Sequence, residues 1–292
     1  MENLRTIKNR LKTIGSIIKA VNSMKMIATV KLARVNNTHK QAKACSSMLS
    51  DMLGKALREC TLSRLPEQSS WIKGCLLDQA NQHGVTRESL IIVLSTNQGF
   101  CGSFNQCILH AASELIGKYD GACVEVFGKI GRAAIPQKRP VARESEPPHD
   151  MRTAPEYARY LSELVVDYII NYGVGSVFVV SGKFENILVQ KGQVSTLWPV
   201  ECNSEPGEIV KIEGDVGSFL NDLLHMYLYE TFVGLVIEHM ISEYSARVMT
   251  LDASVRNAND MFDRLQLQCN RIRQDRITQE LTEIVSSIEC ML

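Results

Sequence analysis

The sequence has neither proline nor glycine after Gly234, so nothing in its last 58 residues breaks a helix. It also has no apolar run long enough to cross a membrane, because runs such as 90–94 and 177–180 are far too short. The N-terminal segment is rich in Lys and Arg but has no apolar core of the secretory type. We therefore expect that any association with a membrane comes through a partner.

Motifs for metal, disulfide and nucleotide chemistry are also missing. The nine cysteines form no CxxC pair, and the six histidines form no HxxxH or HExxH pattern. This argues against a zinc site or a disulfide framework and favours a reducing compartment. The loop 97–105 (NQGFCGSFN) follows an apolar run, as a phosphate-binding loop would, but it lacks both the GxGxxG spacing and a GK[ST] ending.

For that loop we prefer a tight strand-to-helix turn to a phosphate site. Cys101 within it is interpreted as a buried structural thiol, with a nucleophile as the less favoured alternative. The chain is thus predicted to be non-catalytic, with no cofactor and no metal.

Charge is balanced overall but not along the chain. There are 32 basic and 32 acidic residues, which gives no indication of nucleic-acid binding. Residues 1–43, however, hold ten Lys or Arg and one acid. Two interpretations remain open: a solvated helix face balanced within the chain, or a rod that faces acidic surfaces of other chains.

Both ends of the chain carry apolar residues at steps of three and four. A stripe at an average spacing of 3.5 residues predicts two long helices that supercoil with a left hand. Because one compact domain separates them in sequence, the two helices must run antiparallel if they pair. The stripe residues are Leu4, Ile7, Leu11, Ile14, Ile18, Val21, Ala28, Leu32 and Val35 near the N-terminus, and Ile237, Met240, Tyr244, Val248, Leu251, Val255, Ala258, Phe262, Leu265, Cys269, Ile272, Ile277, Leu281, Ile284 and Ile288 near the C-terminus.

The middle of the chain reads as an inserted α/β domain. Continuous aliphatic runs predict buried strands, helical spacing predicts helices between them, and 186–199 reads as a hairpin that turns at Lys191 and Gly192. We therefore predict a Rossmann-like, mixed five-stranded sheet. The predicted domains are 1–60 for the N-terminal coiled-coil helix, 75–208 for the α/β domain and 212–292 for the C-terminal coiled-coil helix. The predicted strands lie at 89–96, 124–127, 177–181 and in the two arms of the hairpin, and the predicted helices at 106–119 and 154–172.

Three stretches together resemble the γ subunit of the F-type ATP synthase. They are MKMIATVKL at 24–32, STNQGFCGSFN at 95–105, and the long segment 242–286, which includes RQDRITQELTEIVS. The last of these runs is close to diagnostic by itself, and the resemblance covers essentially the whole chain. Ser103 stands where the family usually has glycine, and the tail SIECML replaces a small-residue ending.

The resemblance implies a central rotor shaft that couples proton translocation through the membrane ring to ATP synthesis or hydrolysis. Its implied partners are the α and β subunits of the catalytic hexamer, the ε subunit and the membrane ring of c subunits. It implies a peripheral location on the cytoplasmic face of a bacterial inner membrane, with the matrix face of a mitochondrial inner membrane as the alternative. Nucleotide chemistry would stay on the surrounding subunits.

Carried over position by position, the resemblance marks a set of coupling residues. Arg273 and Gln274 resemble a pair that hydrogen-bonds a loop of a catalytic subunit, for which a guanidinium fork is well suited. The full set is Met24, Arg247, Arg273, Gln274, Thr278, Glu280 and Glu283.

Two other classes of function were weighed against the rotor. One is a structural coiled-coil adaptor with an α/β head, which would self-associate and leave nucleotide turnover unchanged. The other is an α/β enzyme whose helices only dimerise it, with a small-molecule site near residues 99–105.

Overall fold

The computed structural model describes residues 4–62, 88–119, 121–136, 146–148, 150–186, 189–200 and 214–289. The chain divides into two compact units, which we call the terminal unit (Met1–Ala28 with Val248–Leu292) and the central unit (Thr29–Arg247). Two helices, α1 (Leu4–Leu62) and α6 (Val216–Glu289), contribute residues to both units. No helix in the described ranges is both long and apolar enough to span a bilayer.

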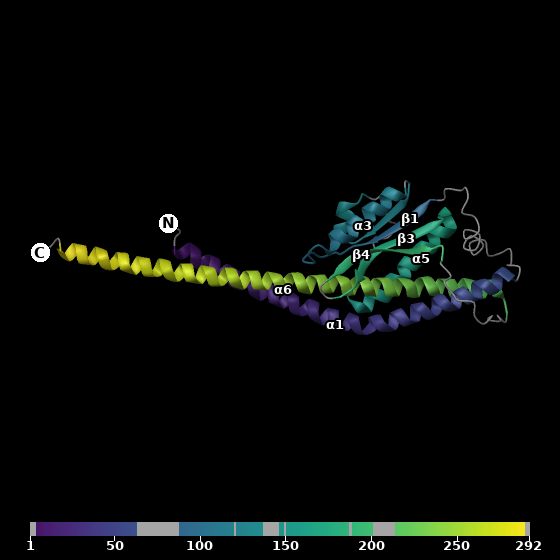
Figure 1. Cartoon of the computed structure of the whole chain (residues 1–292), viewed down its shortest axis with the longest axis horizontal. Helices are drawn as coiled ribbons and strands as arrows, with labels where there is room; N and C mark the ends of the chain where they lie inside the picture. Colours follow the sequence, from purple (N-terminus) through teal and green to yellow (C-terminus); the bar gives the residue numbers. More distant parts are fainter. Residues whose placement is uncertain are drawn as a thin grey trace. The chain divides into compact units, whose positions relative to one another are not determined.

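In the terminal unit, α1 and α6 lie side by side and run antiparallel (Figure 1). Lys25 forms an ion pair with Asp252, and Gly15 lies against the ring of Phe262. Ten residues toward the N-terminus of α1 thus correspond to ten residues toward the C-terminus of α6, as an antiparallel pair requires. Stripe residues such as Ile7 and Leu251 are buried there, so the predicted stripe is the seam of the pair.

The central unit contains a four-stranded sheet of order β2-β1-β3-β4. Strand β1 (Ser89–Leu94) pairs in parallel with β2 (Cys123–Phe127) and with β3 (Ser176–Phe184), and β4 (Gln190–Trp198) pairs antiparallel to β3. The sheet is therefore mixed, as predicted.

Helices cover both faces of this sheet, which explains why β1 is aliphatic from Leu90 to Leu94. Ile91 and Val93 face a cluster with α3 (Phe104–Lys118). Leu90, Ile92 and Leu94 face the opposite cluster, which contains α5 and the central-unit parts of α1 and α6. Alternate side chains from Leu90 to Leu94 thus enter two different cores, so both faces of the strand need apolar residues there.

The remaining helices are short or capped by identifiable residues. They are α4 (Lys129–Ala134), the single 3₁₀ turn η1 (Met151–Thr153) and α5 (Ala154–Tyr172). Helix α5 has proline in its first turn and ends at Gly173, which adopts the left-handed conformation with φ 62°. Both features are typical of helix ends.

The prediction of a hairpin turning at Lys191 and Gly192 is wrong, and so is the count of five strands for the described part of the chain. Both residues lie inside β4, where they pair with Lys183 and Gly182 of β3. The chain reverses earlier, where the backbone groups of Asn186 and Val189 exchange hydrogen bonds of 3.3 Å. The segment predicted to form both arms of a hairpin thus forms one strand, β4, which pairs with β3. Among the described residues, the sheet therefore has four strands instead of five.

The predicted fold class, two long terminal helices with an inserted α/β domain, is confirmed. The predicted domain boundaries remain predictions, because the junctions at 60–75 and 208–212 fall almost wholly outside the described residues.

Candidate functional site

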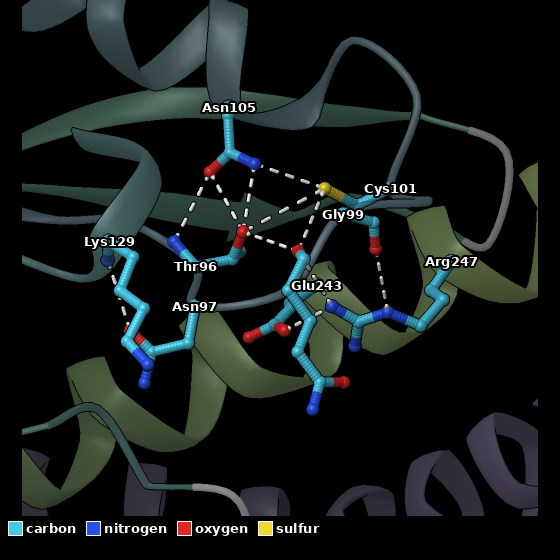
Figure 2. A network of polar contacts seen from close by, with 9 residues as sticks. Thr96, Asn97, Gly99, Cys101, Asn105, Lys129, Glu243 and Arg247 are labelled. Carbon is cyan, nitrogen blue, oxygen red and sulfur yellow. Dashed lines mark hydrogen bonds and ion pairs between the residues drawn. The ribbon is translucent and has the colours of Figure 1, made fainter. Parts of the chain in front are cut away.

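A polar network joins the end of β1 to the start of α3 (Figure 2). Asn105, in the first turn of α3, accepts hydrogen bonds from both the backbone N–H and the hydroxyl of Thr96, each at 3.2 Å. Its amide nitrogen in turn donates to Thr96 Oγ1 at 2.8 Å and to Cys101 Sγ at 3.1 Å. Since Thr96, Cys101 and Asn105 are all buried, this network fixes the loop from beneath.

Arg247 of α6 fastens the same loop from the other side (Figure 2). Its Nε donates to the carbonyl oxygen of Gly99 and its Nη2 to that of Gln98, both at 3.3 Å. Nη2 also contacts Glu243 Oε1 at 2.5 Å, one helical turn back. Only 8% of Arg247 is exposed, so its charge is neutralised by Glu243 and by the loop carbonyls rather than by solvent.

The environment of Cys101 is that of a structural thiol. Burial raises the pKa of Cys101, although the hydrogen bond from Thr96 and the charge of Arg247 act in the opposite direction. A thiol with a raised pKa is a poor nucleophile at neutral pH. The prediction that this thiol is buried is therefore confirmed, and the raised pKa is in keeping with a structural role.

The geometry of the loop also fits the predicted tight turn between strand and helix. The first N–H of α3, at Phe104, donates to the carbonyl of Cys101, and the N–H of Thr96 donates to Asn105. The N–H groups at the two ends of the loop are thus occupied by the chain itself. The loop turns through Phe100 and Gly102, which have φ of 62° and 57°. Phe100 is 63% exposed.

The structure separates the predicted coupling residues into two groups. Arg247 is buried in the central unit, whereas Met24 and the five residues near the end of α6 are exposed in the terminal unit. Among those five, the hydroxyl of Thr278 donates to the carbonyl of Gln274 at 3.0 Å, and Glu280 forms an ion pair with Arg276 at 3.0 Å. Arg273, Gln274, Thr278, Glu280 and Glu283 are therefore exposed at several sides of the same helix end, whereas Arg247 is buried in the central unit.

Helix α6 extends past the described start of α1. On the register set by Lys25 and Asp252, Leu4 of α1 lies opposite Arg273. The apolar residues beyond that point are therefore not covered by the described part of α1, and each is 50–58% exposed. They are Ile277, Leu281, Ile284, Val285 and Ile288.

Analysis of the sequence missed the partners of Arg247. A Glu–Arg pair at i and i+4 is visible in the sequence as Glu243 and Arg247, and this was the available signal. The contacts with the carbonyls of Gln98 and Gly99 gave no signal in the sequence, since these residues lie about 150 positions away from Arg247 in the chain.

This architecture, an antiparallel pair of terminal helices with an α/β insertion, is matched by known proteins over the full length of the chain. The sequence model of the ATP synthase family matches residues 3–291, and the chain belongs to this family. The resemblance identified from the sequence is thereby confirmed.

Relatives in that family that match the chain from end to end are ATP synthase gamma chains. The gamma chain of Desulforudis audaxviator is 30% identical over 304 aligned residues, with 98% of both chains covered. Those of Clostridium novyi and Campylobacter jejuni are 28% and 25% identical; the alignments cover 98% and 100% of this chain, and 97% and 100% of the relatives.

Solved structures share the fold at lower sequence identity. A chain of the Euglena gracilis mitochondrial ATP synthase superposes with a TM-score of 0.63 at 13% identity, covering 99% of this chain and 94% of the other. A chain from the central stalk and c-ring of the Tetrahymena thermophila mitochondrial ATP synthase gives 0.52 at 14% identity, covering 80% and 99%.

Proposed function

We propose that the chain is the central rotor subunit of an F-type ATP synthase and is itself non-catalytic. The observation that carries this proposal is the end-to-end match to gamma chains. The exposed apolar stripe at the end of α6 supports it, because such a stripe needs a partner surface.

The stripe has the spacing of a contact surface on one side of a helix. Ile277, Leu281, Ile284 and Ile288 recur at steps of four, three and four, so they lie on one face. Each of them is about half exposed within this chain. In the proposed assembly, the ring of α and β subunits covers this face.

We propose that this chain acts on the catalytic subunits by contact alone and carries out no chemical step itself. A stiff, asymmetric pair of helices offers different surfaces to three otherwise equivalent catalytic sites. Each site then shifts its conformational equilibrium by the difference in contact free energy between its states. A change from 1:99 to 99:1 needs about 5.5 kcal/mol of such a difference, a modest amount for an interface of several side chains.

The exposed residues near the end of α6 are candidates to make the contacts that differ. Arg273 and Gln274 are free of the α1 seam and exposed, so they can bind acidic or carbonyl groups of a catalytic subunit. Glu280 is paired with Arg276 within the helix. We expect Thr278 and Glu283 to make further contacts at the same helix end, and Met24 and Arg247 to act at other points of the chain.

The basic first helix is proposed to face acidic loops of the catalytic subunits. Lys8, Lys12 and Lys19 are exposed, which suits them for this role. Lys25 differs, since it already pairs with Asp252 in its own chain. A charge-reversal test should therefore use the first three lysines and leave Lys25 intact.

The further partners that we propose are the ε subunit and the c-ring, and membrane association comes through them. The relatives that match the chain over its full length with 25–30% identity are bacterial. We accordingly assign the chain to the cytoplasmic face of a bacterial plasma membrane, as a peripheral subunit of a proton-translocating complex.

Reconstitution tests the proposal directly. The purified chain is mixed with α and β subunits from the same source, and ATP hydrolysis is measured against α and β alone. The rotor proposal expects stimulation at a stoichiometry of fewer than one chain per β subunit. An unchanged rate together with self-association of the chain would favour the coiled-coil adaptor instead.

A further inference from the structure

A small closed cavity lies in the central unit, between the end of β1, helix α5 and helix α6. Its volume is about 10 Å³, and its lining includes Leu94 of β1, Tyr157 of α5, and His239 and Glu243 of α6. Space of this size corresponds to about one water molecule and excludes organic ligands.

Two polar groups in this lining are buried and have no hydrogen-bond partner among the described residues. The hydroxyl of Tyr157 and the Nε2 of His239 make no hydrogen bond, and the two residues are 5% and 4% exposed. A buried donor without a partner destabilises the folded chain, so two such groups beside one cavity require an explanation.

The tautomer of His239 follows from the hydrogen bond that its Nδ1 makes. Nδ1 accepts a hydrogen bond from the backbone N–H of Gly182 at 3.1 Å, so Nδ1 carries no proton. A neutral imidazole then has its proton on Nε2, and this N–H is a donor. The residues that line the cavity therefore include two with a free donor, Tyr157 O–H and His239 Nε2–H, and one that carries an acceptor, Glu243.

We propose that this cavity is a binding site for one structural water molecule. The water accepts hydrogen bonds from the Nε2–H of His239 and the hydroxyl of Tyr157, and it donates one to the carboxylate of Glu243. Water can both accept and donate hydrogen bonds. A metal cation would be repelled by the two donor hydrogens, and chloride would be repelled by the carboxylate. The lining thus selects a neutral ligand that is both donor and acceptor.

The bound water would position the carboxylate that holds Arg247. Glu243 contacts Arg247 Nη2, and Arg247 in turn binds the carbonyls of Gln98 and Gly99. A chain of contacts then leads from Tyr157 on α5 through the water to the β1–α3 loop. Tyr157 makes no direct hydrogen bond to Glu243, so the water would be the hydrogen-bonded link between these two residues.

The direct test is a crystal structure of the full-length chain at a resolution that shows ordered water. The proposal expects a density peak within about 2.7–3.2 Å of Tyr157 Oη, His239 Nε2 and a Glu243 carboxylate oxygen. A cavity without density, a direct bond between the lining groups, or a peak with the anomalous signal of an ion would each overturn it.

A double-mutant cycle gives an independent readout in solution. Tyr157→Phe and Glu243→Gln are made singly and together, and the urea midpoint of unfolding is measured for each. A shared water makes the midpoint shifts of the single variants non-additive, whereas additive shifts would contradict the proposal.

The matched control is a second double-mutant cycle, in which Glu238→Gln takes the place of Glu243→Gln. Glu238 is on the same helix and is half-buried, but it lines a different cavity with His39 and Thr231. The midpoint shifts of Glu238→Gln and Tyr157→Phe are expected to add. If both cycles showed equally large deviations from additivity, this would also contradict the water site.

Discussion

Lys25 on α1 and Asp252 on α6 form an ion pair across the two antiparallel helices, and Arg256 contacts the second carboxylate oxygen of Asp252 at 2.9 Å. One acid thus receives a cation from each helix. The hydrogen bond from Lys25 is the main cause that lowers the pKa of Asp252. The pair marks the register of the terminal unit, because it allows only one alignment of the helices at this point.

Lys25→Glu is expected to lower the thermal midpoint of the isolated chain, since it places two carboxylates opposite each other. Far-UV circular dichroism would measure the midpoint. The loss should shrink between 0.1 M and 1 M salt, where the screening length falls from about 10 Å to about 3 Å. Lys19→Glu, on the same helix but exposed, serves as the control and should leave the midpoint nearly unchanged.

Arg247→Ala should destabilise the central unit by about 3 kcal/mol, because Glu243 loses its ionic partner in a mostly buried place. Urea unfolding measures this loss. Labelling of Cys101 by a thiol reagent should become faster, since the loop above it is no longer held, with Cys101→Ser identifying the signal. Arg256→Ala, which breaks an exposed pair on the same helix, should cost less than about 1 kcal/mol. Equal costs for the two variants would contradict the role of Arg247.

Stability should fall on mild acidification because of His239. Burial lowers the pKa of His239 to about 4, below the ordinary value of 6.5 in an unfolded chain. The unfolded state therefore binds more protons between these values, and the contribution of neutral His239 is complete above about pH 6.5 and is lost as the pH falls toward 4. Between about pH 7 and pH 5 this amounts to roughly 2 kcal/mol.

Urea unfolding of His239→Gln at the same two pH values would test this, because the variant should lose less stability than the wild type. His110, which is exposed on α3, provides the control. His110→Asn should keep the wild-type pH dependence. If His239→Gln also kept it, another group would be responsible.

Gly182→Ala should destabilise the chain by about 1–3 kcal/mol through overpacking. A Cβ at this position would lie 2.4 Å from the ring of Phe104, which is itself buried. Gly117→Ala is the control with the opposite sign. Nothing lies within 4 Å of its Cβ position on α3, so the substitution should stabilise the helix by about 0.5–1 kcal/mol. Thermal midpoints of the two variants compare them directly.

Leu281→Gln with Ile284→Gln should leave the isolated chain as stable as the wild type, because both side chains are more than half exposed. In the proposed assembly, the same double variant should reduce stimulation of ATP hydrolysis by α and β subunits. Arg273→Ala should do the same without affecting the fold. Normal stimulation by both variants would contradict the assignment of the α6 end as a contact surface.

The sequence was sufficient to predict the elements whose burial is periodic. The terminal helices followed from the spacing of their apolar residues, because each buries one stripe against the other helix. Strand β1 followed from its continuous aliphatic run, because both of its faces are buried. The β4 strand was misread, since Lys191 and Gly192 have the composition of a turn. Gly192 is required there for another reason: a Cβ would lie 2.5 Å from the carbonyl oxygen of Cys107 on α3. Close packing between distant segments leaves no local pattern to read.

The candidate site was predictable only in part, for the same reason. The exposed residues near the end of α6 came from the resemblance, and their roles remain predictions. The contacts of Arg247 and the cavity beside His239 depend on loops and helices that meet only in the folded chain. Burial of polar groups such as Thr96 and Asn105 could not be inferred from their spacing, because polar residues in a loop sequence usually indicate solvent.

Ser242 of α6 is fully buried, and a Cβ at Gly182 of β3 would lie 3.2 Å from the Cβ of Ser242. If α6 slid by one turn along the strand, Glu238 or Ala246 would occupy this place. The first would bury a carboxylate, and either slip would pull Arg247 away from Gly99. Sliding of this helix along the sheet is therefore opposed, and a force along the axis of this segment of α6 is carried into the sheet.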